Sequence, residues 1–382
     1  METRKLYYED AHMSQFQATV LRCEQTKHGY EVTLDATAFY PEGGGQAGDT
    51  GTLGGVRVLD THEKDGTVVH YCEAPLTEGT LVEGKIDYEA RFYRMQQHTG
   101  EHIVSGIIHR RHGYHNVGFH MGNQSITIDF DGVIPMEEIP DIEREANEAV
   151  WKNLPVSCTY PSPEALETIA YRSKKALPWP VRIVEVPGSD TCACCGTHVK
   201  NTGEIGVIKL ISAMPFRGGT RMEMACGAQA LHLLNACFDQ NRLVSQAFSA
   251  KILETGEAAQ RMNDQVAALK YRLTGLERQL FEGIAANCAG KGDVVHFEEN
   301  LDNVAVRELA DKIADVCGGM AAVFSGSDAD GYAFCMVTRE GDLRQLCKDM
   351  TAALGGRGGG KPNFQQGRVN APKAEIEAFF TK

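Results

Sequence analysis

The sequence predicts an α+β protein built from successive domains. Its 382 residues exceed the size of an ordinary single domain, which holds about 100–200 residues. Strand-like segments dominate the beginning, helical and strand patterns alternate later, and an apolar heptad repeat separates two such regions. We therefore expect a β-barrel-like domain (1–90), an α+β domain (91–235), a helical linker or coiled coil (236–286) and a C-terminal α/β domain (287–382).

The barrel-like domain is predicted from short segments rich in β-branched and aromatic residues. They are Gln17–Arg22, Tyr30–Leu34, Val56–His62 and Thr67–Cys72. Gly, Asp and Lys turns separate them. Short strands at this spacing are typical of a small barrel or sandwich.

The second domain begins with a segment, Arg91–Arg111, that has the apolar spacing of a helix. His98 and His102 are four residues apart on it, so both imidazoles project from one face. Further elements expected here are strands at Gln124–Phe130 and Arg182–Val186, and a helix that begins at Pro140.

An apolar heptad seam marks the third region. Its members, at alternating spacings of three and four, are Ala259, Met262, Val266, Leu269, Leu273, Leu276 and Leu280. An earlier helix is expected at Ala236–Leu253, with a break at Thr255-Gly256. The seam can pack as a hairpin within the chain or pair two chains, so a homodimer through this region or the C-terminal domain stays open.

The last domain alternates strands and helices, which predicts a small α/β fold. Strands are expected at Val294–Phe297, Met320–Phe324 and Tyr332–Val337, and helices at Val304–Val316, Leu343–Leu354 and Lys373–Phe380. A Gly-rich loop, Gly355–Gly360, is expected between the last two helices.

This Gly-rich segment formally fits the pattern G-x-x-x-x-G-K. Its residues are Gly355, Gly356, Arg357, Gly358, Gly359, Gly360 and Lys361. An ATP-binding loop is excluded, because Pro362 replaces the Ser or Thr that would hold magnesium and because a helix precedes the segment. Backbone N–H groups with Arg357 and Lys361 can instead bind a phosphodiester backbone. The alternative is a flexible connector.

Two pairs of metal-binding residues lie in separate parts of the predicted α+β domain (91–235). His98 and His102 supply two imidazoles, and Cys194 and His198 supply a thiolate and a third imidazole. Zinc takes this donor set. Four ligands would close the site and three would leave a position for water, so ligation by His198 stays open. Glu101 does not directly follow the first histidine, as in the H-E-x-x-H metalloproteases, so we expect it behind the ligands or facing solvent.

Composition narrows the class of protein. The net charge of −13 argues against indiscriminate nucleic-acid binding but not against a local site. No apolar run reaches the roughly 18 residues of a membrane span, and the residues at Met1–Asp10 lack the apolar core of a secretory signal. The twelve cysteines then indicate reduced thiols in a cytoplasmic protein with no membrane partner.

A glycine-rich turn in the first domain is a second candidate site. Thr37 and Gln46, on either side of Gly43, Gly44 and Gly45, carry hydrogen-bonding side chains, and the glycines let backbone approach a ligand closely. Taken alone, the segment is more typical of a barrel turn.

These segments together resemble one family, the stand-alone alanyl-tRNA editing proteins of the long AlaX type. That family is similar to the editing domain of alanyl-tRNA synthetase. The matching segments are Thr37–Gly48, His98–His102, Val117–His120, Cys194–Val199 and Thr202–Gly206, and the end of the chain resembles a DHHA1-type domain. One departure is Cys195, which stands where the family usually has glycine.

The resemblance implies an aminoacyl-tRNA hydrolase with one Zn²⁺ per chain. Its substrate would be tRNA(Ala) mischarged with serine or glycine, which a second site removes because the synthetase cannot exclude them. The resemblance implies that Thr37 and Gln46 are catalytic-site residues that recognise the serine hydroxyl. It implies substrate contacts from Gly43, Gly44, Gly45 and His120, and tRNA contacts from residues 355–361. The metal would activate a water or anchor the substrate.

Two other functions stay open. A zinc-dependent hydrolase of a small substrate would act without RNA, and a tRNA-binding module with structural zinc would bind without turnover.

Overall fold

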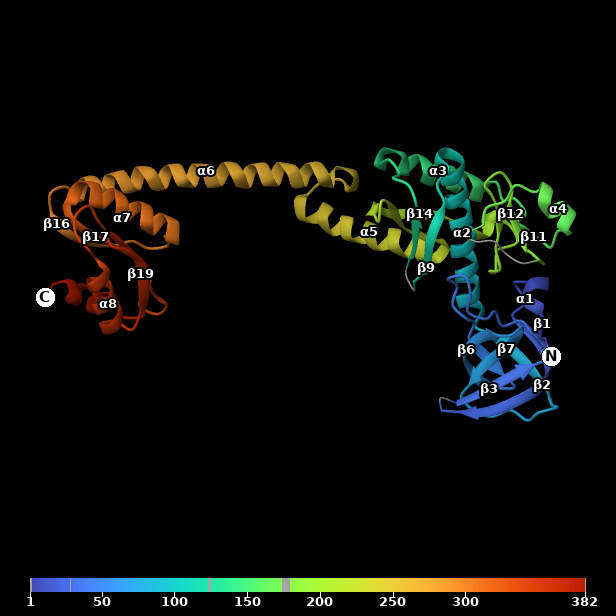
Figure 1. The fold of residues 1–382 in the computed structure, drawn as a ribbon. Helices are drawn as coiled ribbons and strands as arrows, with labels where there is room; N and C mark the ends of the chain where they lie inside the picture. The colour runs from blue at the N-terminus through green and yellow to red at the C-terminus, as the bar shows by residue number, and fades with distance from the viewer. Residues whose placement is uncertain (1, 28, 123–124, 174–178, 382) are drawn as a thin grey trace. The chain divides into compact units, whose positions relative to one another are not determined.

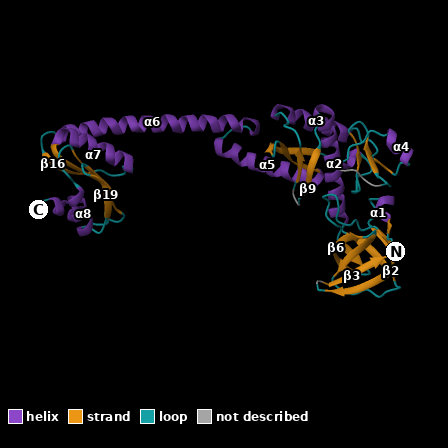
Figure 2. Ribbon diagram, in the orientation of Figure 1, coloured by secondary structure: helices purple, strands orange, loops and turns teal. Residues whose placement is uncertain are grey.

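The computed structural model describes residues 2–27, 29–122, 125–173 and 179–381. The chain forms two compact units, unit 1 (Met1–Leu243) and unit 2 (Val244–Lys382), shown in Figure 1. Both units combine helices and strands, and the strands belong to several separate sheets (Figure 2). The mixed α+β class therefore agrees with the expectation, whereas the four domain boundaries stay a prediction.

A closed barrel forms the N-terminal part of unit 1. In barrel order its strands are β2 (Gln15–Thr26), β3 (Gly29–Leu34), β7 (Thr67–Cys72), β6 (Val56–Lys64), β5 (Gly51–Leu53) and β8 (Leu81–Ile86). Alternate side chains of β2, Phe16, Ala18 and Val20, are buried inside, as the two-residue period of a strand requires. All four predicted strand segments lie within these strands.

Three short elements lie beside the barrel. They are β1 (Arg4–Lys5), α1 (Leu6–Glu9) and β4 (Ala36–Thr37). β1 pairs in parallel with β4, so the N-terminus fixes the strand from which the glycine-rich turn departs.

Helix α2 (Tyr88–His112) is the central helix of unit 1. Every residue from Met95 to Ile108 is buried, because α3, β13 and β15 pack around the helix. Gly106 allows β13 to come close, since a methyl group there would lie 2.1 Å from the backbone oxygen of Ser189. The helix ends at Gly113, which adopts the left-handed conformation.

Two antiparallel sheets complete unit 1. One has the order β14 (Ile208–Phe216), β15 (Gly219–Cys226), β10 (Ile126–Phe130) and β9 (Asn116–Met121), and the other β11 (Ser157–Thr159), β12 (Ile183–Val186) and β13 (Asp190–Ala193). The remaining helical elements are η1 (Met136–Glu138), α3 (Ile139–Trp151), α4 (Pro163–Thr168), η2 (Thr202–Ile205) and α5 (Gly227–Phe248), which continues into unit 2. Pro140 lies in the first turn of α3, and Gln124 lies outside the described residues.

The predicted helix break at Thr255-Gly256 is wrong. The helix expected at Ala236–Leu253 already ends at Phe248, because Ser249 adopts a left-handed φ of 50°. Helix α6 (Thr255–Cys288) then begins at the position where the break was expected.

The C-terminal part of unit 2 is a five-stranded mixed sheet covered on both faces. Its elements are β16 (Gly292–Phe297), α7 (Asn303–Cys317), β17 (Gly318–Ser327), β18 (Gly331–Thr338), α8 (Arg344–Ala353), β19 (Arg357–Lys361), β20 (Phe364–Val369) and α9 (Lys373–Phe380), with strand order β16-β17-β18-β20-β19. The short helix η3 (Ile252–Glu254) directly precedes α6. Ala321 and Val323 of β17 pack with α7, whereas Met320 and Phe324 pack with α8 and α9.

The Gly-rich segment after α8 is a strand, which corrects the expected loop. β19 pairs antiparallel with β20 at the edge of the sheet, and all of its residues are exposed. A Cβ at Gly358 would lie 2.6 Å from the Phe334 ring, so the missing side chain lets the strand lie against its neighbours. Backbone pairing therefore outweighs the low strand propensity of glycine.

The heptad seam of α6 is exposed along most of its length. From Met262 to Leu280 its six apolar members are between 42% and 64% exposed. Only the C-terminal turns of the helix, with Phe281 and Ala285, pack against α7. Across the described residues, no helix combines the length and apolar character that a bilayer span needs.

Candidate active site

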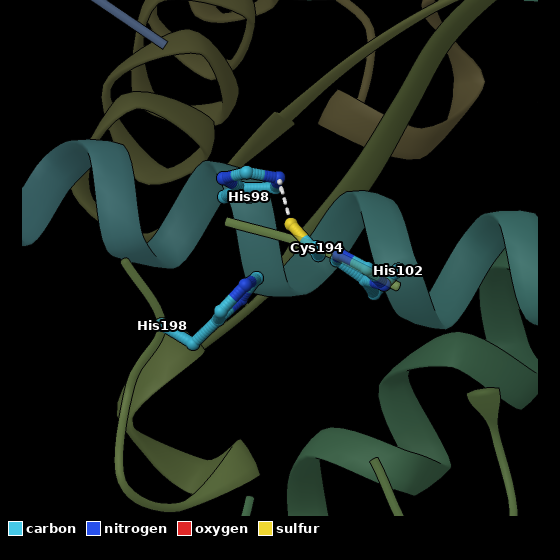
Figure 3. A group of neighbouring side chains, drawn as sticks. All are labelled: His98, His102, Cys194 and His198. Atoms are coloured by element: carbon cyan, nitrogen blue, oxygen red, sulfur yellow. Dashed lines mark hydrogen bonds between the residues drawn. The ribbon is translucent and has the colours of Figure 1, made fainter. Parts of the chain in front are cut away.

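The four predicted metal ligands converge at one point beside α2 (Figure 3). The candidate ligand atoms of His98, His102, Cys194 and His198 all lie within 4.8 Å of one another. The first two come from successive turns of α2, and the other two follow β13 in the chain. Cys194 Sγ lies 3.4 Å from His98 Nε2. Sulfur and nitrogen atoms bound to one tetrahedral zinc ion would be roughly 3.6 Å apart.

Each imidazole of this cluster is held through its Nδ1 atom by a different side chain. The contacts are His98 to Gln46 Oε1 at 3.1 Å, His102 to Asp190 Oδ2 at 2.7 Å and His198 to Thr99 Oγ1 at 3.4 Å. Such partners fix the tautomer of metal-binding histidines and direct Nε2 at the metal. Within the described residues, His198 Nε2 is buried without a hydrogen-bond partner. This orphaned nitrogen fits a fourth metal ligand.

The charge states of the cluster follow from burial and from the close contacts. Burial raises the pKa of the Cys194 thiol, but the imidazoles of His98, His102 and His198 hold it well below its usual value. Burial lowers the pKa of His198 to about 3, so its lone pair is available. Burial also lowers the pKa of His102, yet the hydrogen bonds to Asp190, Cys192 and Cys194 together outweigh this and raise the pKa well above normal. A metal ion must therefore displace a proton from His102.

Asp190 is itself fixed by an arginine. Arg172 Nε and Nη2 each donate to one carboxylate oxygen at 2.7 Å. Burial raises the pKa of Asp190, but the hydrogen bonds from His102 and Arg172 bring it below its usual value. Sequence reasoning missed both residues. The position of Asp190, four residues before Cys194, was the available signal.

Gln46 reaches the cluster from the glycine-rich turn. Its Oε1 accepts hydrogen bonds from His98 Nδ1 and from the Thr197 backbone at 3.3 Å, and its Nε2 donates to Thr197 Oγ1 at 2.9 Å. The side chain is fully buried. Gln46 therefore joins the barrel turn both to α2 and to the loop that carries Cys194 and His198.

A buried ion pair fixes this turn against α2. Arg91 Nε donates to Asp49 Oδ2 at 2.9 Å, and the Arg91 guanidinium also donates to the Ala11 and Ala38 carbonyl oxygens. Asp49 accepts a further bond from the Tyr40 backbone at 2.6 Å. Since both charged side chains are fully buried, removing Asp49 would leave the Arg91 charge without its carboxylate. Removing Arg91 would leave Asp49 with the contact from Arg94 Nη1 at 3.3 Å.

Thr37 lies against the barrel strand β7, where it contacts His70. Its Oγ1 is 2.8 Å from His70 Nε2 and accepts a bond from the Phe39 backbone at 3.1 Å. Burial lowers the pKa of His70 to about 4, so this ring is neutral at pH 7. His70 Nδ1 lies 3.0 Å from the Val32 carbonyl oxygen and donates to it, so Nε2 accepts the Thr37 proton. The role of Thr37 as a reader of serine stays a prediction.

A cavity of about 700 Å³ opens onto the metal-ligand cluster. Of the three predicted glycines, Gly44 lines it, whereas Gly43 forms the turn through two backbone hydrogen bonds with Gln46 at 3.0 Å. Phe119 of β9 lines the cavity, and the next residue, His120, is exposed, as alternation along a strand requires. His120 is not among the described lining residues.

Glu101 lines this cavity next to the ligand residues without being one of the four clustered ligands, so of the two expected positions it takes the one beside the ligands and not the one in solvent. The carboxylate is buried, and it accepts hydrogen bonds from Ser105 Oγ and Asn116 Nδ2, both at 2.5 Å. The i, i+3 spacing from His98 places both residues on one face of α2. The H-E-x-x-H pattern concerns only the position directly after the first histidine, so it does not indicate a buried carboxylate three residues after it.

The two neighbouring cysteines differ in exposure. Cys195, which replaces the family glycine, is exposed and lines the cavity. The Gly196 backbone N–H still donates to Cys194 Sγ at 3.4 Å, so the turn that presents the thiolate is kept. Cys192 is buried and lies near His102 on the side of Asp190.

The predicted tRNA contacts lie in unit 2. Arg357 and Lys361 stand at the two ends of β19 and are exposed. They are four residues apart in a strand, so both side chains point to the same face, about 13 Å from each other along the chain.

Three family models match the chain in succession. They are tRNA synthetases class II (A) at residues 2–90, the threonyl and alanyl tRNA synthetase second additional domain at residues 181–224, and the DHHA1 domain at residues 290–381. The second of these covers the loop that carries Cys194 and His198.

Similar proteins match from end to end. The chain is 29% identical to the alanyl-tRNA editing protein AlaX-L of Pyrococcus horikoshii, over 97% of this chain and 96% of that protein. It is 27% identical to the alanyl-tRNA editing protein Aarsd1 of Danio rerio, over 97% and 95%. It is 32% identical to an alanine–tRNA ligase of Halorubrum lacusprofundi over 96% of this chain, but it spans only 42% of that ligase. The chain is therefore similar along nearly its whole length to alanyl-tRNA editing proteins, and it spans less than half the length of the alanine–tRNA ligase that it matches.

Proposed function

We propose that this protein is a trans-editing hydrolase that deacylates tRNA(Ala) mischarged with serine, and also with glycine, in a zinc-dependent reaction. The observation that carries the proposal is the buried cluster of three Nδ1-anchored imidazoles and one thiolate, which opens onto the cavity. This donor set suits zinc. The similarity to alanyl-tRNA editing proteins supports the substrate class. We expect a cytoplasmic protein, because such a substrate arises where translation takes place.

The residues around the cluster position both metal and substrate. When bound, a zinc ion held by His98, His102, Cys194 and His198 supplies Lewis acidity to a water or to the ester carbonyl. Gln46, Asp190 and Thr99 hold the imidazole rings in place through the contacts described above. The cavity is of the size that holds a small ligand, so it suits the terminal aminoacyl-nucleoside rather than the tRNA body.

Discrimination between serine and alanine requires a polar group in the site. A buried hydroxyl or amide that pairs with the serine hydroxyl would be left unpaired by alanine, which costs about 1–3 kcal/mol. Thr37, supported by Gln46, is our candidate for this reader. The Thr37 hydroxyl donates to His70 and accepts one bond from the Phe39 backbone, so its second lone pair can accept a bond from the serine hydroxyl.

We also propose that Arg357 and Lys361 of β19 contact tRNA phosphates. A glycine-rich edge strand carries no other side chains that would keep a backbone phosphate away. Arg357→Ala should weaken tRNA binding and reduce the slope of log affinity against log salt by about one. The matched control is Arg344→Ala, since Arg344 is exposed but already paired with Asp342. An unchanged slope in the Arg357 variant would refute the contact.

A homodimer through α6 is the arrangement we favour among those that the heptad seam allows. The seam is apolar, exposed and periodic in seven residues, which suits an identical helix of a second chain. Arg272 and Glu277 flank it at positions that face each other across a parallel coiled coil, so opposite charges would meet.

A deacylation assay tests the proposed function. Purified protein is incubated with Ser-, Gly- and Ala-tRNA(Ala), with and without a chelator that removes the metal. We expect rapid cleavage of the serine ester, slower or comparable cleavage of the glycine ester, sparing of the alanine ester, and loss of activity without metal. Cleavage of small esters without RNA would favour the small-substrate hydrolase, and tRNA binding without turnover would favour the binding module.

A further inference from the structure

The cavity at the metal-ligand cluster reaches the surface beside Cys195. This residue is exposed and is one of the described residues that line the cavity. The cavity has the size of a terminal aminoacyl-nucleoside, so the rest of the tRNA strand must leave it for the surface. Side chains next to an exposed lining residue are therefore candidates for contact with the nucleotide that precedes the terminal one.

Two tyrosines lie close to Cys195 at this rim. Tyr8 belongs to α1 and Tyr160 directly follows β11, and their ring centroids are 6.3 Å apart in an edge-to-face arrangement. Burial raises the pKa of both phenols, and the Cys195 thiol lies near enough to add to the rise. Tyr160 is 52% exposed whereas Tyr8 is half-buried, so the ring of Tyr160 is the one that a ligand can reach.

Arg182 holds this aromatic pair against the loop that carries the metal ligands. The guanidinium of this buried residue lies 4.9 Å from the centroid of the Tyr8 ring, and a cation is attracted to the face of such a ring. Arg182 Nη1 also donates to the carbonyl oxygens of Cys194 and Gly196, at 2.9 and 3.0 Å. The rings therefore have a fixed position relative to the ligand residue Cys194.

We propose that Tyr160, supported by Tyr8, stacks on the unpaired base of the nucleotide that precedes the aminoacylated terminal nucleotide of the tRNA. This inference rests on the proposed function and assigns a binding site to a second nucleotide of the substrate. Aromatic side chains stack on every kind of base, so Tyr160 positions the strand and does not read its sequence.

A nucleotide suits this rim better than a protein partner does. The chain has a net charge of −13, so its general attraction for phosphates is weak, and stacking supplies affinity that does not depend on charge. A protein seated on Tyr8 and Tyr160 would cover the exposed Cys195 and obstruct the cavity that the substrate enters. The substrate strand, in contrast, can occupy the cavity and the rim together.

The test combines removal of the base with removal of the ring. The substrates are Ser-tRNA(Ala) and the same tRNA with an abasic nucleotide next to its terminal adenosine. The proteins are the wild type, Tyr160→Ala, Tyr160→Phe and the control Tyr271→Ala, since Tyr271 of α6 is a tyrosine that is 85% exposed. Deacylation kinetics, metal content and thermal unfolding are measured for each protein.

We expect removal of the base to lower kcat/KM of the wild type about five- to a hundredfold, as for loss of one base–aromatic stack. Tyr160→Ala should lower kcat/KM for the complete substrate by a similar factor. In this variant the abasic substrate should be cleaved as well as the complete one, because the ring and the base act as a pair. Tyr160→Phe keeps the ring, so it and Tyr271→Ala should behave like the wild type.

Two results would overturn the inference while leaving the proposed function intact. One is equal cleavage of both substrates by the wild type, which needs no variant and therefore does not depend on how Tyr160→Ala folds. The other is that the losses from Tyr160→Ala and from the missing base multiply, which would show that the two groups do not contact each other. If the wild type cleaves neither substrate, the proposed function itself fails, and the inference fails with it.

Discussion

Helices α2 and α6 are the two longest helices in the part of the chain that the structure describes, with 25 and 34 residues, and their surroundings are opposite. Along α2 every residue from Met95 to Ile108 is buried, polar ones included. Along α6 most residues are exposed, and this holds for the apolar seam as well. Polar residues in a buried helix mark a functional site here, whereas apolar residues on an exposed helix mark a surface that can take a partner.

The buried polar residues of α2 are informative because nearly all of them have partners. Gln97, for example, exchanges two hydrogen bonds with the Cys226 backbone, at 2.9 and 3.0 Å. Unpaired polar atoms are costly in a protein interior. Against this background, the unpartnered Nε2 of His198 stands out as a site for a ligand.

The largest loss of activity is expected from a substitution in the metal-ligand cluster beside α2. Cys194→Ala should remove zinc and reduce deacylation of Ser-tRNA(Ala) by more than about a hundredfold, since the site loses its thiolate. Metal content and single-turnover deacylation measure the two effects on the same sample.

Cys195, the exposed neighbour of Cys194, provides the control for Cys194→Ala. Cys195→Gly restores the usual residue of the family and should keep both metal and activity. A metal-free Cys194→Ala protein that still cleaved the ester at the wild-type rate would rule out the zinc-dependent mechanism.

A smaller loss of zinc affinity or activity is expected at Asp190, which contacts the ligand residue His102 and not the metal itself. Asp190→Asn should weaken zinc binding or activity by about ten- to a hundredfold, because His102 loses the carboxylate that orients its ring. Competition with a chromophoric chelator measures the affinity. Asp342→Asn is a suitable control, because Asp342 is an exposed carboxylate in unit 2 that pairs with Arg344 and belongs to none of the described groups that could hold a metal. Wild-type affinity in the Asp190 variant would show that the hydrogen bond does not matter.

The smallest effect on catalysis is expected on α6. Leu273→Lys should convert the proposed dimer to a monomer, since it places a charge in the apolar seam, and deacylation should stay within about twofold of wild type. Sedimentation velocity measures the assembly. Tyr271→Lys is the control, because Tyr271 is 85% exposed and outside the seam. A wild-type protein that is monomeric at all concentrations would refute pairing through α6.

The sequence sufficed for features that depend on local spacing. Helical periodicity located α2, and the H-x-x-x-H and C-x-x-x-H patterns identified four residues that the fold brings together. Alternation located the barrel strands. These patterns are encoded within a few turns or one strand, so they need no knowledge of tertiary contacts.

Features that depend on distant contacts could not be predicted in this way. The bond between Gln46 and His98 joins residues 52 positions apart, and that between Asp190 and His102 joins residues 88 apart. The strand β19 exists because β20 pairs with it, although its own glycines favour a loop. The contact of the Thr37 hydroxyl with His70 joins residues 33 positions apart, which no local pattern indicates.

Gly106 has a consequence for engineering this protein. Replacing a glycine inside a helix by alanine is a common route to higher thermal stability and gains about 1 kcal/mol of helix propensity. At this position the new methyl group would press on the Ser189 carbonyl, 2.1 Å away, and push back the strand on which Asp190 lies. A thermostabilised variant should therefore keep this glycine, because the gain in helix propensity would come with a shift of Asp190, which orients the His102 ring.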